Sequence, residues 1–468
     1  MAAAAGLVRE AGYRVVGSDK DLYPPMSTML EELAIKVHTP YGPENLTREK
    51  PDQVVIANAL SRGHDELEFA LEQNLTTTSF PALLGELFLK DKGSIVVTGT
   101  HGKTTTTSLV SHVLFELKKD PSFLIGGIPK NFTRSFRLGK GALFAIEGDE
   151  YDTAYFDKGP KFLHYHPKFL IVNNIEFDHA DIYENLDAIK KRFVQVMKLV
   201  ENPENIIANG CDENVLDCLK TAGVLDKALL VGVADNSHGK ACRVRLQDLN
   251  TENKCGWQGT FTTTQWGNIS LQTNLTGYHN MANIAHVLGL LDRLVAAGAI
   301  EKPAPSALQD AFASFLGVAR RLDFLGEKGG VDVYEDFAHH PTAVGKVIEG
   351  FRKSSPEKRL LVAFEPKNAT SRRNIFLEAY ASAFQKADRA YIGPCPQDQR
   401  ISQDNRMDTD SLAKAIGGHA ASFSDNKRLL EAVVQDAARG DAVIFMSSGS
   451  FSGVQHEILE KLGEKFSC

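Results

Sequence analysis

Residues 98–107 read Thr-Gly-Thr-His-Gly-Lys-Thr-Thr-Thr-Thr and directly follow the apolar run 94–97. This order predicts a strand, a glycine-bearing turn and the start of a helix. The two glycines would let successive backbone N–H groups point inward at a phosphate. The lysine would supply positive charge for terminal phosphates, and the next threonine a hydroxyl for Mg²⁺. The first glycine of the spacing G-x-x-x-x-G-K-[ST] stands two places late, yet strand, lysine, hydroxyl run and helix together indicate a nucleoside triphosphate site. The alternative is a glycine turn before an ordinary helix.

The bulk composition is that of a large globular protein. The chain has 468 residues, of which 43% are hydrophobic and 24% charged, and this length predicts about three domains. The net charge of −7 argues against binding to nucleic acid or to a membrane surface. The six cysteines form no C-x-x-C pair, which favours a reducing cytosol over a disulfide scaffold or a zinc site. No apolar run reaches the roughly 18 residues that span a bilayer, so we expect a cytoplasmic protein.

Helical and strand-like segments alternate along the chain, which is typical of an α/β fold with parallel sheets. A polar break at 90–93 and a junction at 317–321 divide the alternation into three units. We therefore predict domains at 1–91, 92–316 and 317–468, the second with an antiparallel excursion over 240–275. The predicted helices are 2–12, 66–73 and 281–297, and the predicted strands are 13–16, 54–57, 142–146, 169–172, 331–334, 360–364, 389–392 and 442–446.

The first residues lack part of the pattern of a dinucleotide-type unit. In such a unit a glycine-rich loop precedes, by about 20 residues, an acidic residue that follows the second strand. Asp19 has that acidic position after Ser18, but only 18 residues precede it and they begin inside a helix. We expect a Rossmann-like domain with a truncated or misassigned start and a missing first strand. The alternative is a domain that begins with a helix.

Two carboxylate-rich clusters follow predicted strands. Residues 147–152 (Glu-Gly-Asp-Glu-Tyr-Asp) come after the strand 142–146, and residues 173–179 (Asn-Asn-Ile-Glu-Phe-Asp-His) after the strand 169–172. Ligands of α/β proteins bind at the carboxyl ends of parallel strands. The clusters offer oxygen ligands and one imidazole for Mg²⁺, and the alternative for each is a solvated acidic loop.

Further polar residues have both a structural and a functional interpretation. Asn280 and Asn283 open a helix, where such side chains are caps or recognise a base. Arg320 and Arg321 stand at the junction of the second and third units, where a guanidinium could reach a γ-phosphate or form an interdomain salt bridge.

Two other polar segments follow strands of the third unit. His339 and His340 precede a proline and could bind metal, but no third ligand has suitable spacing, so we expect a polar site facing the cleft. Arg372 and Arg373 lie in a loop after the strand 360–364. A pair of arginines suits carboxylate recognition, and the alternative is a solvated basic loop.

The set of motifs resembles the Mur ligases, the ATP-dependent amide ligases of peptidoglycan assembly. The matching segments occur in the family's order at 98–107, 147–152, 174–179, 277–283, 317–321 and 335–341. Two kinds of Mur ligase share the His-His-Pro and Gly-Val-x-Arg-Arg forms. One adds L-alanine to UDP-N-acetylmuramate, and the other joins the tripeptide L-Ala-γ-D-Glu-meso-diaminopimelate to it in murein recycling. The second kind is favoured by segments 23–27, 149–157, 162–165, 176–181 and 336–342.

The resemblance implies a Rossmann-like domain for the UDP-sugar, a central P-loop ATPase domain and a Rossmann-like domain that delivers the amine. It implies that ATP phosphates are bound by Gly99, Thr100, His101, Gly102, Lys103, Thr104 and Thr105, with Mg²⁺ at Thr104, Glu147 and His179. It further implies that Asn280 and Asn283 face adenine, that Arg321 and Asp336 face the nucleotide, and that His340 lies near the incoming amine. Lys103, Glu147, His179, Arg321 and His340 are then the expected catalytic residues. We also expect substrate contacts from Ser18 and Asp19, and peptide carboxylates at Arg372 and Arg373.

The implied reaction has two steps. The lactyl carboxylate of the sugar attacks the γ-phosphate to give an acyl phosphate, which the α-amine of the peptide then attacks. Mg²⁺ and Lys103 would stabilise the developing charge, and domain closure would align the reacting groups. We expect a monomer in the bacterial cytoplasm that binds neither nucleic acid nor membranes. Two alternatives stay open: a truncated ligase that binds nucleotide without catalysis, and a ligase similar to folylpolyglutamate synthase.

Overall fold

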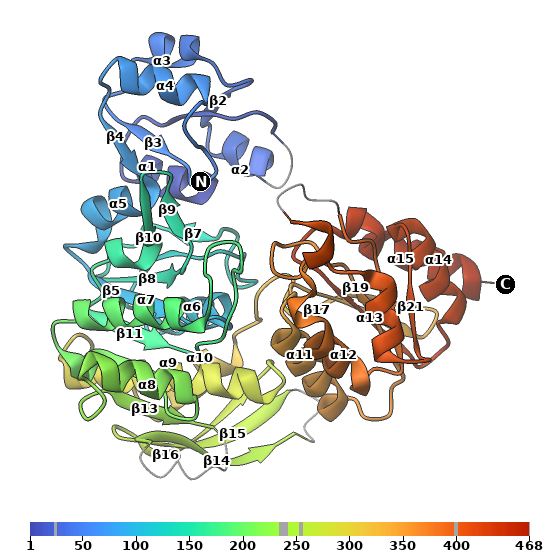
Figure 1. Ribbon diagram of the computed structural model, residues 1–468. Helices are drawn as coiled ribbons and strands as arrows, with labels where there is room; N and C mark the ends of the chain where they lie inside the picture. Colours follow the sequence, from blue (N-terminus) through green and yellow to red (C-terminus); the bar gives the residue numbers. More distant parts are fainter. Residues whose placement is uncertain (23–25, 234–241, 252–255, 397–400, 468) are drawn as a thin grey trace.

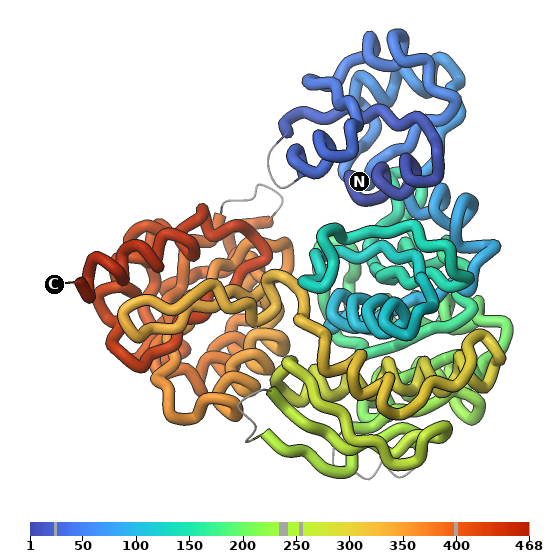
Figure 2. The backbone as a smooth tube through the Cα atoms, turned by 180° about the vertical axis from the view of Figure 1, so that it is seen from behind, coloured from blue at the N-terminus to red at the C-terminus, as the bar shows by residue number. Residues whose placement is uncertain are grey.

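The computed structural model describes residues 1–22, 26–233, 242–251, 256–396 and 401–467. Residues 23–25, 240–241, 252–255 and 468, which belong to segments discussed above, lie outside the described residues. The chain forms three α/β domains in sequence order (Figure 1), and the N-terminal and C-terminal domains contact different parts of the central one. The view from behind shows the same arrangement (Figure 2). Within the described residues, every helix is too short or too polar to cross a membrane.

The N-terminal domain contains two separate pairs of short parallel strands. Strand β1 (Val16–Ser18) pairs with β2 (Lys36–His38), and β3 (Val54–Ile56) pairs with β4 (Thr77–Ser79). The helices between and beside them are α1 (Ala2–Glu10), α2 (Met26–Glu32), α3 (Pro43–Glu49), α4 (Asp65–Glu72) and α5 (Phe80–Leu84). The predicted strand 13–16 is wrong in its bounds, because pairing with β2 fixes the strand at Val16–Ser18. Ser18 is therefore the last residue of β1, and Asp19 follows it.

The central domain is built on a ten-stranded sheet in the order β16-β15-β14-β13-β12-β11-β5-β8-β6-β7. Strand β5 (Gly93–Thr98) lies between β11 (Phe169–Val172) and β8 (Leu143–Gly148), and all three are parallel. The side chains of Ile95, Val96 and Val97 are fully buried, as expected of a parallel strand covered on both faces. The carboxyl ends of these three strands meet at one edge of the sheet, where the phosphate loop begins.

The rest of this sheet extends on both sides. Strands β14 (Val244–Asn250), β15 (Trp257–Thr263) and β16 (Gly267–Thr273) are antiparallel, which confirms the predicted excursion within the described residues. The remaining strands are β6 (Ser122–Leu124), β7 (Phe136–Arg137), β12 (Ile206–Asn209) and β13 (Leu229–Gly232), with β9 (Asp152–Ala154) and β10 (Asp157–Pro160) forming a separate hairpin. The helices are α6 (Lys103–Glu116), α7 (Leu186–Leu199), α8 (Glu213–Ala222), α9 (Tyr278–Ala296) and α10 (Pro305–Ala313).

The C-terminal domain has a six-stranded sheet in the order β17-β18-β22-β19-β20-β21. The four predicted strands are present as β18 (Val331–Asp336), β19 (Leu360–Phe364), β20 (Arg389–Ile392) and β22 (Ala442–Met446). Two edge strands were not predicted, β17 (Asp323–Lys328) and β21 (Ala420–Ser422). Neither contains a fully buried residue, so neither has the apolar run by which a central strand is recognised. The helices are α11 (Pro341–Ser354), α12 (Leu377–Ala383), α13 (Thr409–Ile416), α14 (Asn426–Asp436) and α15 (Val454–Phe466).

Candidate active site

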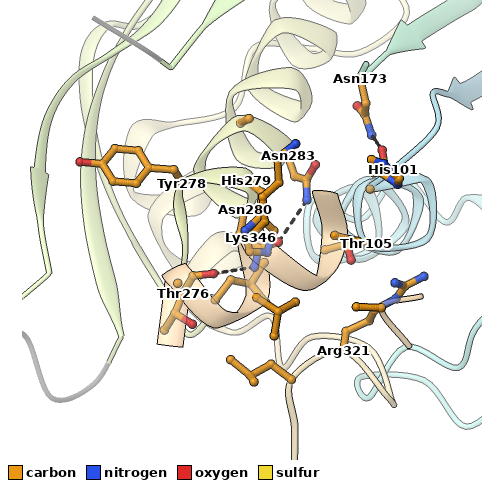
Figure 3. Close-up of a pocket in the computed structure, with 18 of the residues that line it drawn as sticks. His101, Thr105, Asn173, Thr276, Tyr278, His279, Asn280, Asn283, Arg321 and Lys346 are labelled. Atoms are coloured by element: carbon orange, nitrogen blue, oxygen red, sulfur yellow. Dashed lines mark hydrogen bonds between the residues drawn. The ribbon is translucent and has the colours of Figure 1, made fainter. Parts of the chain in front are cut away.

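A large cavity lies between the central and C-terminal domains, at the carboxyl ends of β5, β8, β11 and β18. Its volume is about 1630 Å³, and Figure 3 shows part of its lining. Most of the residues predicted from the sequence to bind nucleotide or metal line it, namely Thr100, His101, Gly102, Lys103, Thr104, Thr105, Glu147, His179, Asn280, Asn283, Arg321, Asp336 and His340. The fold therefore brings together side chains from six motifs that are up to 240 residues apart.

The phosphate loop has the backbone that its glycines permit. Gly99 and Gly102 have φ values of +132° and +83°, a region that other residues rarely adopt. A Cβ atom on Gly102 would lie 2.8 Å from Asn283 Oδ1, so even alanine would be strained there. The loop is also fixed from outside, because the backbone N–H of His101 donates to Asn174 Oδ1 at 2.8 Å. Helix α6 begins at Lys103 and directs its positive dipole end toward the loop.

Lys103 is held by a buried ion pair that the sequence analysis did not identify. Its Nζ donates to the carbonyl of Gly99 at 2.7 Å and lies 2.9 Å from Glu150 Oε2. The second oxygen of Glu150, Oε1, lies 2.9 Å from His179 Nε2. Burial alone would raise the pKa of Glu150, but the charges of Lys103 and His179 lower it to about 2. For His179, burial opposes the charged form, but Glu150 outweighs it and raises the pKa above its ordinary value.

The C-terminal domain contacts this group through Thr370. Thr370 is fully buried, and its hydroxyl donates to Asp178 Oδ1 at 2.7 Å. The same Oγ1 accepts the backbone N–H of His179 at 3.1 Å. His179 has a φ of +56°, which is a left-handed backbone conformation. Its backbone N–H donates to both Asp178 and Thr370, and these two contacts help to hold that conformation.

Thr104 and Glu147 form a second hydrogen-bonded pair, and both were predicted to be metal ligands. The Thr104 hydroxyl donates to Glu147 Oε2 at 3.1 Å, and the N–H of Gly126 donates to Glu147 Oε1 at 2.5 Å. Glu147 lies within β8, one residue beyond the predicted end of that strand. Burial, together with the nearby charge of Asp149, raises the pKa of Glu147 to about 7. A hydroxyl and a carboxylate with a destabilised negative charge are suited to Mg²⁺, which prefers hard oxygen ligands. Of the predicted metal ligands, Thr104 and Glu147 are in direct contact, whereas His179 is hydrogen-bonded to Glu150.

A third polar group contains one histidine of the His-His-Pro motif. The sequence offers no third metal ligand with suitable spacing near His339 and His340, but the fold places two residues of other segments beside His340. The ligand atoms of His101, Glu176 and His340 all lie within 4.8 Å of one another. His339 and His340 both line the cavity, as expected of a polar site facing the cleft. Spacing along the chain does not reveal the group, because its residues meet through packing of the C-terminal domain on the central one.

The asparagines and arginines are engaged in different ways. Asn280 lies in the first turn of α9, whose N-cap is Gly277, so the capping interpretation is wrong. Its Nδ2 donates to the carbonyl of Thr276 at 2.8 Å, and its Oδ1 accepts from Asn283 Nδ2 at 3.1 Å (Figure 3). Arg320 forms an ion pair with Glu335 at 2.7 Å, within the C-terminal domain and not between domains.

Arg321 and Asp336 lie side by side at the C-terminal wall of the cavity. The Arg321 guanidinium lies 5.2 Å from the centre of the Phe337 ring. Asp336 accepts backbone N–H groups of Leu322 and Ala338, each at 2.6 Å. Burial raises the pKa of Asp336, against the opposing charge of Arg321. Asp336 therefore shapes the turn that carries Arg321.

Five predicted residues do not line the large cavity. Gly99 lies at the start of the phosphate loop, where its carbonyl accepts from Lys103 Nζ at 2.7 Å. Ser18 Oγ accepts from Asn45 Nδ2 at 3.2 Å, in the N-terminal domain with Asp19. Arg373 lines a separate cavity of about 240 Å³, and its buried Nε has no hydrogen-bond partner among the described residues. The Nε of Arg372 donates to the carbonyl of Asn368 at 3.3 Å.

Three α/β domains around a glycine-turn phosphate loop, with carboxylates on the adjoining strand ends, define the class of ATP-dependent ligases. Models of the Mur ligase family match three parts of the chain: the family's catalytic domain at residues 1–92, the middle domain at 97–291 and the glutamate ligase domain at 320–449. The chain belongs to the Mur ligase family.

Individual relatives match along the full length. UDP-N-acetylmuramate--L-alanyl-gamma-D-glutamyl-meso-2,6-diaminoheptandioate ligase of Escherichia coli (strain K12) is 35% identical over 467 residues, which cover 99% of this chain and 96% of the relative. UDP-N-acetylmuramate--L-alanine ligase of Clostridium perfringens is 27% identical over 469 residues, with coverage of 100% and 95%. The crystal structure of a murein peptide ligase from Psychrobacter arcticus 273-4 is similar with a TM-score of 0.70 and 29% identity, covering 99% of this chain and 96% of that one.

Proposed function

We propose that this chain uses ATP to join L-alanyl-γ-D-glutamyl-meso-diaminopimelate to UDP-N-acetylmuramate, in the recycling of murein peptides. The observation that carries the proposal is the 35% identity over 99% of the chain to the Escherichia coli ligase of that name. Identity to the L-alanine ligase of Clostridium perfringens is lower, at 27%. The cavity that collects the phosphate loop, its lysine and two carboxylates supports the same reaction.

The phosphate loop would hold the triphosphate. Its backbone N–H groups and the start of α6 favour negative charge. The Nζ atom of Lys103 would contact the γ-phosphoryl group while that group is transferred. Glu150 keeps the ammonium oriented through the contact at 2.9 Å. A lysine whose position is fixed before the reaction stabilises the charge that develops on the phosphoryl oxygens without reorganisation.

Thr104 and Glu147 would hold Mg²⁺, with His179 and Glu150 at the adjacent position. The ion supplies charge neutralisation on the phosphate oxygens, so that the sugar carboxylate can approach an anionic group. The ionised form of Glu147 is disfavoured by burial and by Asp149, and a bound cation would remove that penalty.

The UDP-sugar and the tripeptide would bind to the N-terminal and C-terminal domains respectively. We assign the UDP-sugar to residues 1–91, with Ser18 and Asp19 at the carboxyl end of β1, and ATP to residues 92–316. The tripeptide is assigned to residues 317–468, with its carboxylates toward Arg372 and Arg373. Arg321 would face the nucleotide and His340 the incoming amine across the cavity between the domains. Packing of these domains brings carboxylate, phosphate and amine together and supplies the proximity contribution to catalysis. The requirement for ATP and a UDP-sugar supports action in the cytoplasm, and we propose a monomer.

The test is phosphate release from Mg²⁺-ATP by the purified chain. We expect release only when UDP-N-acetylmuramate and the tripeptide are both present, with formation of the amide product measured by mass spectrometry. L-Alanine in place of the tripeptide should give little product. Equal or faster turnover with L-alanine would overturn the choice of amine, and binding of ATP without release under any condition would overturn catalysis.

A further inference from the structure

The group formed by His101, Glu176 and His340 has the ligands of a transition-metal site, and it is separate from the Thr104–Glu147 pair. His101 Nε2 lies 3.4 Å from Glu176 Oε2, and His340 Nδ1 lies 3.9 Å from the same oxygen. A tetrahedral zinc site with bonds of about 2.0–2.2 Å places its ligand atoms about 3.3–3.6 Å apart. The first of these distances already fits, the second needs a movement of a few tenths of an ångström, and the third, between the two imidazole nitrogens, is within 4.8 Å.

The hydrogen bonds of His340 leave the correct nitrogen available. Its Nε2 lies 3.1 Å from the carbonyl of Phe177, and since a carbonyl can only accept, Nε2 carries the proton. The Nδ1 lone pair then faces Glu176, with one long contact of 3.4 Å to the N–H of Thr342. Metal-bound histidines usually donate their other ring N–H to a carbonyl or carboxylate in this way. Burial lowers the pKa of His340 to about 4, so the ring is neutral near pH 7, as metal binding requires.

Glu176 is ionised and held in place. Burial would raise its pKa, but hydrogen bonds from His101 and Thr342 and the nearby charge of Lys346 lower it to about 2. The Thr342 hydroxyl donates to Glu176 Oε2 at 2.6 Å, and Lys346 Nζ lies 3.9 Å from Oε1. The Thr342 contact is to the oxygen that faces the two histidines and the Lys346 contact is to the other oxygen, so together they fix the orientation of the carboxylate. All three residues of the group line the large cavity, which provides both an entry path and a fourth coordination position.

We propose that His101, Glu176 and His340 form a binding site for a divalent ion of the zinc class, which links the central domain to the C-terminal domain. Two imidazoles and one carboxylate suit Zn²⁺, Co²⁺ or Ni²⁺ and do not suit Mg²⁺, which prefers oxygen ligands. His101 belongs to the phosphate loop and Glu176 to the segment after β11, whereas His340 is the N-cap of α11. An ion bound to all three would hold the two domains together at the phosphate loop.

The experiment is a titration of the full chain with Co²⁺, without ATP or substrates and with excess Mg²⁺ to occupy oxygen sites. We expect one Co²⁺ per chain with the visible absorption of tetrahedral cobalt, and displacement of the ion by Zn²⁺. Glu176→Gln and His340→Asn should each weaken binding at least tenfold. Asparagine at position 340 keeps an acceptor for the Thr342 N–H, and circular dichroism of both variants checks their fold. His279→Gln is the matched control, because His279 lines the same cavity outside the group, and it should bind Co²⁺ as the parent does.

Three results would overturn the proposal. The first is the absence of stoichiometric Co²⁺ or Zn²⁺ binding by the parent chain. The second is unchanged affinity in a folded Glu176→Gln or His340→Asn variant. The third is loss of binding in Cys211→Ser, since Cys211 also lines the cavity and would then be the ligand. Because no ATP or substrate is present, failure here is independent of failure of the proposed ligase reaction.

Discussion

Glu147→Gln should make the protein more stable at pH 8 and leave its stability at pH 5 nearly unchanged. The pKa of Glu147 is raised from 4.5 to about 7 by burial and by Asp149. Between these values the folded state keeps a proton that the unfolded state has lost, so stability falls as the pH rises and levels off above about 7. At about 1.4 kcal/mol per pH unit, the parent protein loses at most about 3 kcal/mol of its free energy of unfolding. Glutamine carries no charge, and its side-chain amide can accept the N–H of Gly126 and donate to the hydroxyl oxygen of Thr104.

The assay is thermal unfolding of parent and variant across the pH range without Mg²⁺ or nucleotide. The melting temperature of a domain of 150–250 residues rises by about 2–4 °C for each kcal/mol of added stability. The variant should therefore melt roughly 5–10 °C higher than the parent at pH 8. Saturating Mg²⁺ and ADP should narrow this difference, because the cation stabilises the ionised carboxylate only in the parent. Glu201→Gln, an exposed substitution in the same domain, should show no such pattern. A difference in melting temperature that is equal at pH 5 and pH 8 would refute the reasoning.

Three further substitutions test the roles of individual residues. Lys103→Ala should reduce phosphate release at least 10²-fold, a loss typical of a missing charge-stabilising group, and turnover near the parental rate would exclude Lys103 from catalysis. Gly102→Ala, measured by nucleotide binding, should weaken ATP affinity, because its Cβ would lie 2.8 Å from Asn283 Oδ1; unchanged affinity would show that the loop adapts. The double variant Arg372→Ala/Arg373→Ala should raise the KM for tripeptide while the KM for ATP stays constant, and an unaltered tripeptide KM would remove both residues from peptide binding.

Much of the central domain could be predicted because its signals are local. The run Ile95–Val97 is apolar on both faces, as a buried parallel strand requires, and the glycine turn and helix start follow at once in the sequence. The carboxylates after β8 and β11 could be placed at the same edge of the sheet for the same reason. The antiparallel excursion was equally visible from its composition.

What could not be predicted depends on which side chains meet in three dimensions. The segment 147–152 offers four carboxylates, and only the register of β8 directs Glu147 to Thr104 and Glu150 to Lys103. The capping interpretation of Asn280 failed because α9 begins two residues earlier, at Tyr278. The group of His101, Glu176 and His340 requires two domains to pack, and no spacing along the chain encodes that.

The hydroxyl of Thr370 connects the C-terminal domain to the ammonium of Lys103 through two residues. Thr370 accepts the backbone N–H of His179, the imidazole of His179 contacts Glu150, and Glu150 contacts the lysine. An outward movement of the C-terminal domain would break the first of these contacts and remove one support of the positive-φ backbone at His179. We therefore expect that release of ADP and separation of the two domains occur together.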